Sequence, residues 1–240
     1  MGRTVAVLCA FDDDHRHLRL VDLAARSGLT PPTALRIARQ LVDGELLERR
    51  DDGAYVIARR VWDLGLLAPG PTTLRDLAAP YLQDLHAVTR ATVHLAVRDD
   101  DRALYLDRLS GSTSAAVVSR RGARLPLHAT GVGKVLLAYA PPEVQARVLQ
   151  RLTRQTAFTV TTPRVMRSQL ERVRRDGVAT TADEMTPGTS SIAVPVRDGD
   201  GEVVAALGLV VTSLRRDRPR LTTALTVAAA GVSRELRRRR

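Results

Sequence analysis

Apolar positions in the first third of the chain recur at the spacing of short amphipathic helices. Residues 4–11 and 18–27 each place apolar side chains on one face, and Gly28 is suited to end the second helix. Thr30 and Pro31 are typical of a helix start, as N-cap and first helical residue. In the next helix a buried stripe is predicted at Ala34, Ile37, Ala38 and Leu41. The pattern predicts three helices, with a tight turn before the third.

The opposite face of the third helix carries short polar and cationic side chains that suit the major groove of DNA. The candidate contacts are Pro32, Thr33, Leu35, Arg36, Arg39 and Gln40. Two β-like runs, 46–49 and 54–57, follow and are joined by an Asp-Gly turn, which predicts a hairpin. Three helices and a hairpin in this order indicate a winged helix-turn-helix, with Arg49 and Arg50 near phosphates. The alternative is a small helical interaction domain.

A break in the pattern separates this region from the rest of the chain. Residues 59–67 predict a further helix, the sequence Pro-Gly-Pro at 69–71 interrupts it, and another helix is predicted over 72–89. We expect a hinge at this break. Trp62, the only tryptophan, is expected to pack at the domain junction rather than to stack on a ligand.

The remaining two thirds alternate irregularly between strand and helix patterns. The expected strands are 92–98, 102–109, 114–119, 191–196 and 202–211. The expected helices are 131–139, 141–152, 163–176 and a last helix from about residue 219 to the end. Strands and helices in this order predict the α+β class, with helices packed on an antiparallel sheet.

Composition narrows the class of protein. A length of 240 residues favours two domains of unequal size, and a hydrophobic content of 44% is ample for their cores. The formal charge of +11 indicates a polyanionic partner, and the alternative is a charge that only keeps an arginine-rich protein soluble. Cys9 is the only cysteine, which excludes an internal disulfide. The chain shows no export signal, and its longest apolar run, 203–211, is far shorter than the ~18 residues of a membrane span, so we expect a cytoplasmic protein without a membrane partner.

Several segments resemble the IclR family of bacterial transcriptional regulators. The most specific are residues 125–138 (LPLHATGVGKVLLA), the Asp183–Glu184 pair followed by Gly188, and residues 192–207. The resemblance implies a winged helix-turn-helix over 1–68, a linker helix over 69–90 and a GAF-like effector-binding domain over 91–240. It also implies dimers or dimers of dimers, and effectors that are small organic acids or aromatic compounds.

The resemblance further implies where an effector binds. One wall is implied at the helix start, where Thr130 can cap the helix and free N–H groups suit a carboxylate. The opposite wall is implied at 181–191, with Ser191 where many relatives carry cysteine. Gly208 and Val210 match positions that often hold serines, which predicts a less polar, roomier pocket and a bulkier or aromatic ligand. The candidate effector-binding residues are Thr130, Gly131, Val132, Thr181, Asp183, Glu184, Thr189, Ser190, Ser191, Gly208 and Val210.

The predicted function is a sequence-specific, DNA-binding transcriptional regulator, with repression as the expected mode and a small organic effector controlling operator affinity. A single recognition helix contacts few base pairs, so we expect a homodimer on a pseudo-palindromic operator of double-stranded DNA. No cofactor or metal site is expected, because the histidines lack ligand spacing and Gly131–Lys134 departs from a P-loop. The alternative is a hydrolase or acyltransferase that uses Glu184, His128 or Ser191, with the basic helices as an accessory domain.

Overall fold

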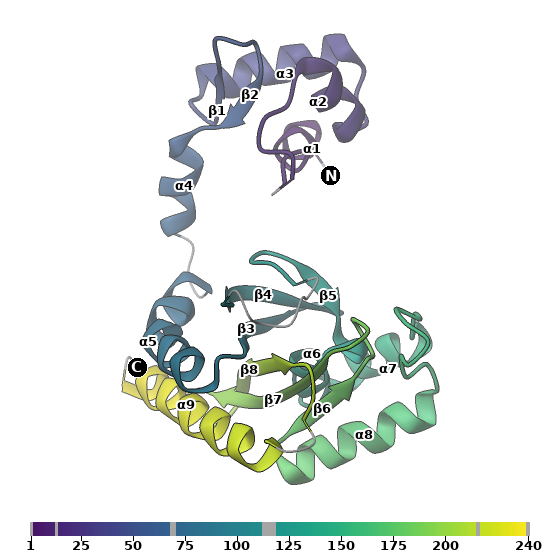
Figure 1. Ribbon diagram of the computed structural model, residues 1–240. Helices are drawn as coiled ribbons and strands as arrows, with labels where there is room; N and C mark the ends of the chain where they lie inside the picture. Colours follow the sequence, from purple (N-terminus) through teal and green to yellow (C-terminus); the bar gives the residue numbers. More distant parts are fainter. Residues whose placement is uncertain (1, 13, 68–70, 112–118, 215–216, 239–240) are drawn as a thin grey trace. The chain divides into compact units, whose positions relative to one another are not determined.

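The computed structural model describes residues 2–12, 14–67, 71–111, 119–214 and 217–238. The chain forms two compact units, Met1–Thr72 and Thr73–Arg240 (Figure 1). Each unit has its own hydrophobic core, so each is a folded body that can be considered by itself.

The first unit consists of three helices, a two-stranded hairpin and a further helix. Its elements are α1 (Arg3–Leu8), α2 (Leu20–Ser27), α3 (Pro31–Asp43), β1 (Leu47–Arg49), β2 (Tyr55–Ile57) and α4 (Arg59–Leu66). Apolar side chains of the first three helices and the hairpin share one core, which includes Val7, Leu23, Ile37, Leu41 and Tyr55. The predicted winged helix-turn-helix order is confirmed.

Local sequence explains the turn between α2 and α3. Gly28 ends α2 at φ +67°, a left-handed conformation that favours glycine. Two details differ from expectation. Leu18 exchanges backbone hydrogen bonds with Tyr55 and so extends the hairpin instead of starting α2. Thr30 precedes α3, but its hydroxyl donates to Thr33 Oγ1 at 3.0 Å and makes no hydrogen bond to a helix N–H.

The second unit is built on one antiparallel sheet, which confirms the predicted α+β class. The strands are β3 (Thr92–Asp99), β4 (Arg102–Leu109), β5 (Arg124–Pro126), β6 (Ala179–Ala182), β7 (Ser190–Arg197) and β8 (Val203–Val211). Their order across the sheet is β5-β4-β3-β8-β7-β6. The helices are α5 (Pro71–Thr89), the 3₁₀ turn η1 (Leu127–Ala129), α6 (Gly131–Ala138), α7 (Pro142–Gln150), α8 (Pro163–Asp176) and α9 (Arg218–Arg238).

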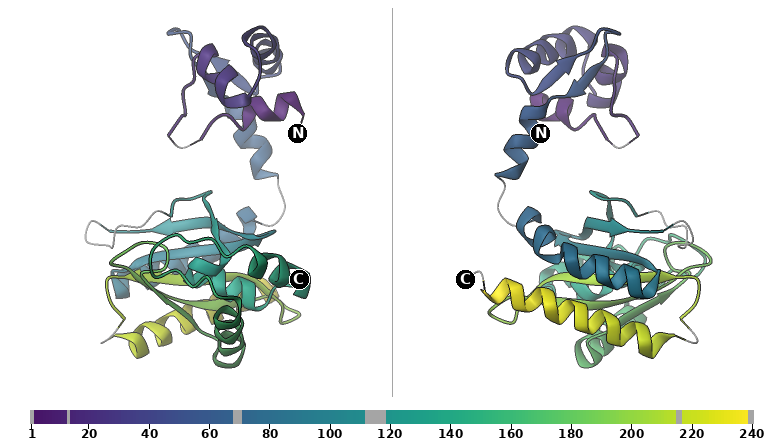
Figure 2. Two further views of the ribbon diagram at one scale, coloured as in Figure 1. Left: turned by 90° about the vertical axis from the view of Figure 1, so that its right-hand side faces the viewer. Right: turned by 60° about the vertical axis from the view of Figure 1, so that its left-hand side comes forward.

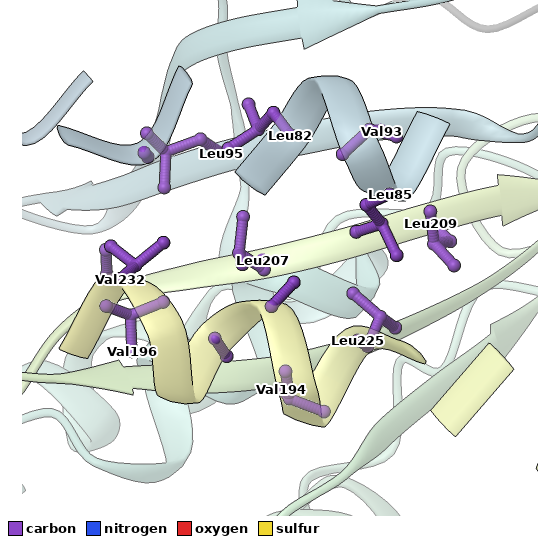
Figure 3. Packing of buried hydrophobic residues seen from close by; sticks show 14 of the residues in the cluster. Leu82, Leu85, Val93, Leu95, Val194, Val196, Leu207, Leu209, Leu225 and Val232 are labelled. Carbon is purple, nitrogen blue, oxygen red and sulfur yellow. The ribbon is translucent and has the colours of Figure 1, made fainter. Parts of the chain in front are cut away.

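Helices cover both faces of this sheet. Leu82 and Leu85 of α5 lie with Leu225 of α9 over one face, against strand side chains such as Val194 and Leu207 (Figure 3). The two helices run side by side (Figure 2), and a Cβ at Gly231 of α9 would lie 2.6 Å from Tyr81 Cδ1 of α5. Helix α6 covers the other face and all its residues are buried, as expected of a helix that is apolar almost all round.

The packing of helices on both faces of the sheet explains which strands the sequence pattern predicts. The nine residues of β8 form a continuous apolar run because the strand is central and both of its faces are covered. Strands β5 and β6 were not predicted, and both are short strands at the edges of the sheet. The expected strand at 114–119 lies, except for Ser119, outside the residues that the structure describes.

Within the first unit Trp62 does not find a packed position, because its side chain on α4 is 60% exposed. Its expected packing at the domain junction stays a prediction. Leu64 and Leu67 beside it are also exposed, at 52% and 78%. This leaves the first unit with an uncovered apolar surface on α4. None of the described helices has the length and apolarity to cross a membrane.

Candidate functional sites

The outer face of α3 presents the side chains that the sequence predicts for DNA contact. Ala34, Ile37, Ala38 and Leu41 are buried, as predicted, which turns the other face outward. Pro32, Arg36, Arg39 and Gln40 are exposed, and Thr33 and Leu35 are half-buried. Arg36 makes one long contact, from Nη1 to Gln40 Oε1 at 3.4 Å. Its guanidinium is therefore available to a base edge or a phosphate.

The hairpin holds its two arginines in place by contacts within the unit. Arg49 lies over the Tyr55 ring, with 5.9 Å from its guanidinium carbon to the ring centroid. Arg50 Nη1 lies 3.2 Å from His17 Nε2. Both side chains are exposed, and their contact with phosphates stays a prediction.

The distribution of charge corrects the first interpretation of the net charge. Acidic and basic residues are equal in number over residues 1–72, so the formal charge of +11 belongs entirely to residues 73–240. The net charge therefore does not identify the DNA-reading unit. Any attraction to DNA in that unit comes from the placement of individual arginines. Counting the charges of each segment separately would have shown from the sequence that the first unit is neutral.

The start of α6 forms one wall of a cavity in the second unit. Thr130 Oγ1 accepts a hydrogen bond from the Gly133 N–H at 3.0 Å, which caps the helix as predicted. The Gly131 N–H donates to Ser191 Oγ at 3.2 Å. Among the described residues, only the Val132 N–H of this first turn has no acceptor. The expected set of free N–H groups is therefore reduced to one.

The opposite wall comes from β6, β7 and the loop between them. Thr181 and Ser191 lie on paired positions of the two strands, and their hydroxyl oxygens are 2.6 Å apart. Thr189 also lines the cavity from the end of the loop, and its hydroxyl donates to the Thr186 carbonyl at 2.7 Å. Hydroxyls therefore dominate the polar groups of this wall.

The glycine on β8 does not enlarge the cavity as expected. A Cβ at Gly208 would lie 2.7 Å from Val132 Cγ1. The Val132 side chain thus occupies the space that a larger residue at 208 would need. The prediction of a roomier pocket at this position is wrong, because helix α6 packs into the gap.

A histidine, a tyrosine and a serine complete the cavity at β3 and β4. Ser119 Oγ lies 2.7 Å from His94 Nε2, and the His94 and Tyr105 rings meet edge to face with centroids 5.0 Å apart. Burial, with a smaller effect of the Arg108 charge, lowers the pKa of His94 to about 3. Burial raises the pKa of Tyr105 to about 12. Both side chains are therefore uncharged near neutral pH, and the sequence analysis identified neither of them.

The cavity is small in this structure. It contains about 40 Å³ of water-accessible space, enough for a few water molecules, whereas ligand sites commonly hold ~300–1,000 Å³. An organic ligand must therefore widen it. The described lining residues are His94, Tyr105, Ser119, Leu125, Ala129, Thr130, Gly131, Val132, Thr181, Met185, Thr186, Thr189, Ser191, Ile192, Gly208, Leu209 and Val210.

Three of the predicted effector residues do not line the cavity. Asp183 stabilises its own loop, where Oδ1 accepts from the Gly188 N–H at 2.6 Å. Glu184 is buried and pairs with Lys134 of α6 at 2.5 Å between Oε1 and Nζ. Ser190 lies at the start of β7 but is absent from the lining. The Glu184–Lys134 pair instead ties the β6–β7 loop to the helix that carries the facing wall.

The groups of the enzyme alternative do not come together. His128 Nε2 bonds to the Thr153 carbonyl at 2.8 Å, while Ser191 bonds to Thr181 and Glu184 to Lys134. Ser119 and His94 are paired, but a histidine with a pKa near 3 is a poor base at neutral pH. The described residues also contain no cluster of three or more His, Cys, Asp or Glu that could hold a metal ion.

A helix-turn-helix unit followed by an α+β unit with a cavity defines a ligand-responsive transcriptional regulator. The model of the bacterial transcriptional regulator IclR C-terminal domain matches residues 70–234, and that of the IclR helix-turn-helix domain matches residues 2–51. The chain therefore belongs to the IclR family of bacterial transcriptional regulators. It combines a helix-turn-helix domain with an effector-binding C-terminal domain.

Relatives of known name agree with this assignment. The glycerol operon regulatory protein of Streptomyces coelicolor is 31% identical over 242 residues, covering 98% of this chain and 95% of that protein. The HTH-type transcriptional regulator XynR of Escherichia coli is 29% identical over 219 residues, covering 90% and 86%. An IclR homolog from Microbacterium hydrocarbonoxydans, crystallised with 4-hydroxybenzoate, is 33% identical with a TM-score of 0.93, covering 98% of this chain and 97% of that chain.

Proposed function

We propose that this regulator reads its operator through Pro32, Thr33, Leu35, Arg36, Arg39 and Gln40 of α3, with Arg49 and Arg50 on phosphates. A small organic acid in the cavity of the second unit changes operator affinity. The observation that carries the proposal is the outward face of α3, where Arg36 contacts only Gln40 among the described residues, in a chain that also contains a cavity lined by hydroxyls. We propose that the protein acts as a repressor, because an operator-bound dimer excludes polymerase from overlapping DNA. We also propose that it acts in the cytoplasm.

The cavity favours an aromatic or similarly apolar body for the effector. No charged residue is among the described lining, and Leu125, Ala129 and Val210 supply apolar surface. Hydroxyls of Thr181, Thr189 and Ser191 supply hydrogen bonds for a polar substituent. The relative that was crystallised with 4-hydroxybenzoate supports an aromatic acid. Of the predicted effector residues, we keep those that line the cavity and assign Asp183, Glu184 and Ser190 to the support of its loop.

The test is a gel-shift titration with DNA from upstream of the protein's own gene. Operator affinity is measured with and without 4-hydroxybenzoate, and then with a panel of other organic acids. A coupling of about 1–3 kcal/mol between the two sites would change operator affinity by roughly 5–150-fold. Specific binding to no tested fragment, or an affinity that no acid changes, would contradict the proposal. A promoter fused to a reporter distinguishes repression from activation.

A homodimer on a pseudo-palindromic operator completes the proposal. Trp62, Leu64 and Leu67 leave apolar surface uncovered on α4, and such surface commonly marks a protein contact. We expect sedimentation at micromolar concentration to show a dimer or larger assembly, and the Trp62→Ala variant to dissociate more readily. An Arg60→Ala change, at an exposed residue of the same helix, is the control. A monomer that still binds a palindromic operator tightly would contradict this assembly.

Bulk at the start of α6 should separate effector response from DNA binding. A Cβ at Gly131 would lie 2.6 Å from Ser191 Oγ, so Gly131→Leu displaces that serine and fills the cavity. We expect effector-free operator binding to stay within about 2-fold while the effector-dependent change, roughly 5–150-fold in the native chain, is lost. Ser168→Leu, on the exposed side of α8, introduces the same side chain elsewhere. An unaltered effector titration in Gly131→Leu would place the ligand in another site.

A further inference from the structure

Arg108 of β4 is a cation for which the described residues provide no ion-pair partner. Its side chain is half-buried, and its Nε is fully buried with no hydrogen-bond partner. No carboxylate among the described residues pairs with its guanidinium. An unsatisfied buried donor costs free energy, more so on a charged group, so packing alone does not explain an arginine here.

Strand register places Arg108 beside the cavity. Arg108 stands directly opposite His94 in the antiparallel β3–β4 pair. Side chains at opposite positions project from the same face of a sheet, so Arg108 shares the face that carries the cavity-lining His94. Its charge contributes, after burial, to the low pKa of His94, which agrees with this proximity.

Thr92 supplies a second unsatisfied polar group on the same face. It is completely buried, and its Oγ1 has no hydrogen-bond partner. Thr92 precedes His94 by two residues, so both side chains lie on one face of β3. It also pairs with Val210 of β8, another lining residue. Among the described residues, three buried side-chain polar atoms have no hydrogen-bond partner, and two of these three belong to residues beside His94.

The chemistry of these groups identifies what they would bind. A guanidinium presents parallel N–H donors that match the two oxygens of a carboxylate, and a threonine hydroxyl can add a third hydrogen bond. The competing anion site at the start of α6 is weaker, because Thr130 and Ser191 already occupy two of its three N–H groups. The cavity is too small for an organic acid as it stands. Of its lining residues, His94 is paired with Arg108 across the strands and is hydrogen-bonded to Ser119.

We propose that Arg108 and Thr92 form the subsite for the effector's carboxylate. The effector reaches them by displacing Ser119 from His94, while its apolar body lies toward Val132 and Val210. This inference rests on the proposed function, because it assumes an organic acid as effector. It assigns the carboxylate to the β3–β4 side of the cavity and not to the α6 helix start.

The test uses calorimetric titration of the full-length protein with two acids and their neutral amides. Benzoate and hexanoate share a carboxylate on different bodies, and benzamide and hexanamide lack the charge. Because a charged hydrogen bond is lost, we expect Arg108→Gln to weaken binding of both acids by about 10–100-fold and of the amides by less than about 2-fold. The affinity of Arg108→Lys for the acids should fall between those of the native chain and Arg108→Gln. Arg102→Gln, at an exposed arginine of the same strand, should match the native chain.

The outcomes separate this inference from the proposed function. Equal acid affinities in Arg108→Gln and the native chain would overturn the subsite and leave the organic-acid effector standing. Failure of both acids to bind the native chain would overturn the organic-acid class together with the subsite. Thermal unfolding of the effector-free variants is the second readout. We expect Arg108→Gln to unfold at or above the native temperature, and a clearly lower temperature would show a structural role instead.

Discussion

Replacing Glu184 with alanine is expected to lower the free energy of unfolding by about 3–5 kcal/mol, because the change strands a buried ammonium group. Lys134 is 1% exposed, and its Nζ lies 2.5 Å from Glu184 Oε1 and 2.7 Å from Gln169 Oε1. Burial lowers the pKa of Lys134, and the Glu184 carboxylate opposes that shift. Without the carboxylate, the folded chain must hold a bare cation or release its proton.

The same change should make stability depend on pH in a defined direction. In the variant the folded-state pKa of Lys134 falls further below its unfolded value, so the unfolded chain binds more protons and stability rises with pH. The deficit is therefore expected to be largest at neutral pH and smaller at about pH 9, closer to the pKa of about 10.4 that lysine has in the unfolded chain. Urea unfolding at the two pH values measures both effects.

An exposed ion pair of the same length provides the control. Arg147 and Asp100 also approach to 2.5 Å, but their side chains are 50% and 73% exposed. We expect Arg147→Ala to change stability by about 0–1 kcal/mol. The double replacement Lys134→Met with Glu184→Leu should recover most of the loss, because it removes both charges. A Glu184→Ala deficit no larger than that of Arg147→Ala would contradict the account of a stranded charge.

Arg36→Ala is expected to weaken operator binding by about 1–3 kcal/mol and to relax sequence preference at one base pair. Arg36 lies on the exposed face of α3 and contacts only Gln40 among the described residues, at 3.4 Å. Because exposed substitutions of this kind alter stability by less than about 0.5 kcal/mol, the unfolding temperature should not change. Binding to the operator and to its single-base variants, measured at fixed salt, tests both parts.

The wing arginines should behave differently. Arg49→Ala or Arg50→Ala is expected to weaken binding to all sequences alike and to reduce the slope of log affinity against log salt by about one. Arg98→Ala, on an exposed arginine in the second unit, should leave operator affinity unchanged. Native operator affinity in a correctly folded Arg36→Ala protein would show that another residue reads that base.

Helical periodicity predicted the fold of the first unit well because burial there follows one stripe. Ala34, Ile37, Ala38 and Leu41 recur at helical spacing, and all four are buried. Turn chemistry added the boundaries, since Gly28 and Gly53 of the Asp-Gly turn take left-handed conformations. Edge strands β5 and β6, of three and four residues, are too short to show a period and were missed.

The cavity was predicted only in part, and the reason is physical. The start of α6 and the β6–β7 region came from a family resemblance, whereas His94 and Tyr105 sit on strands that are buried on both faces. Alternation along such a strand does not distinguish a side chain that meets a cavity from one that meets solid core. The interlocking of Val132 with Gly208 depends on helix–sheet packing, which no local pattern specifies.

Lys134 is the only lysine in the sequence, and it is the residue held in the buried pair with Glu184. The exposed positive charge of the described residues is thus carried by arginine. Reagents and acyltransferases that modify lysine side chains find no accessible target while α6 and the β6–β7 loop stay together. Acylation of Lys134, measured by mass spectrometry, would consequently report directly when this interior opens. Neutralisation of surface lysines cannot change the charge of this protein.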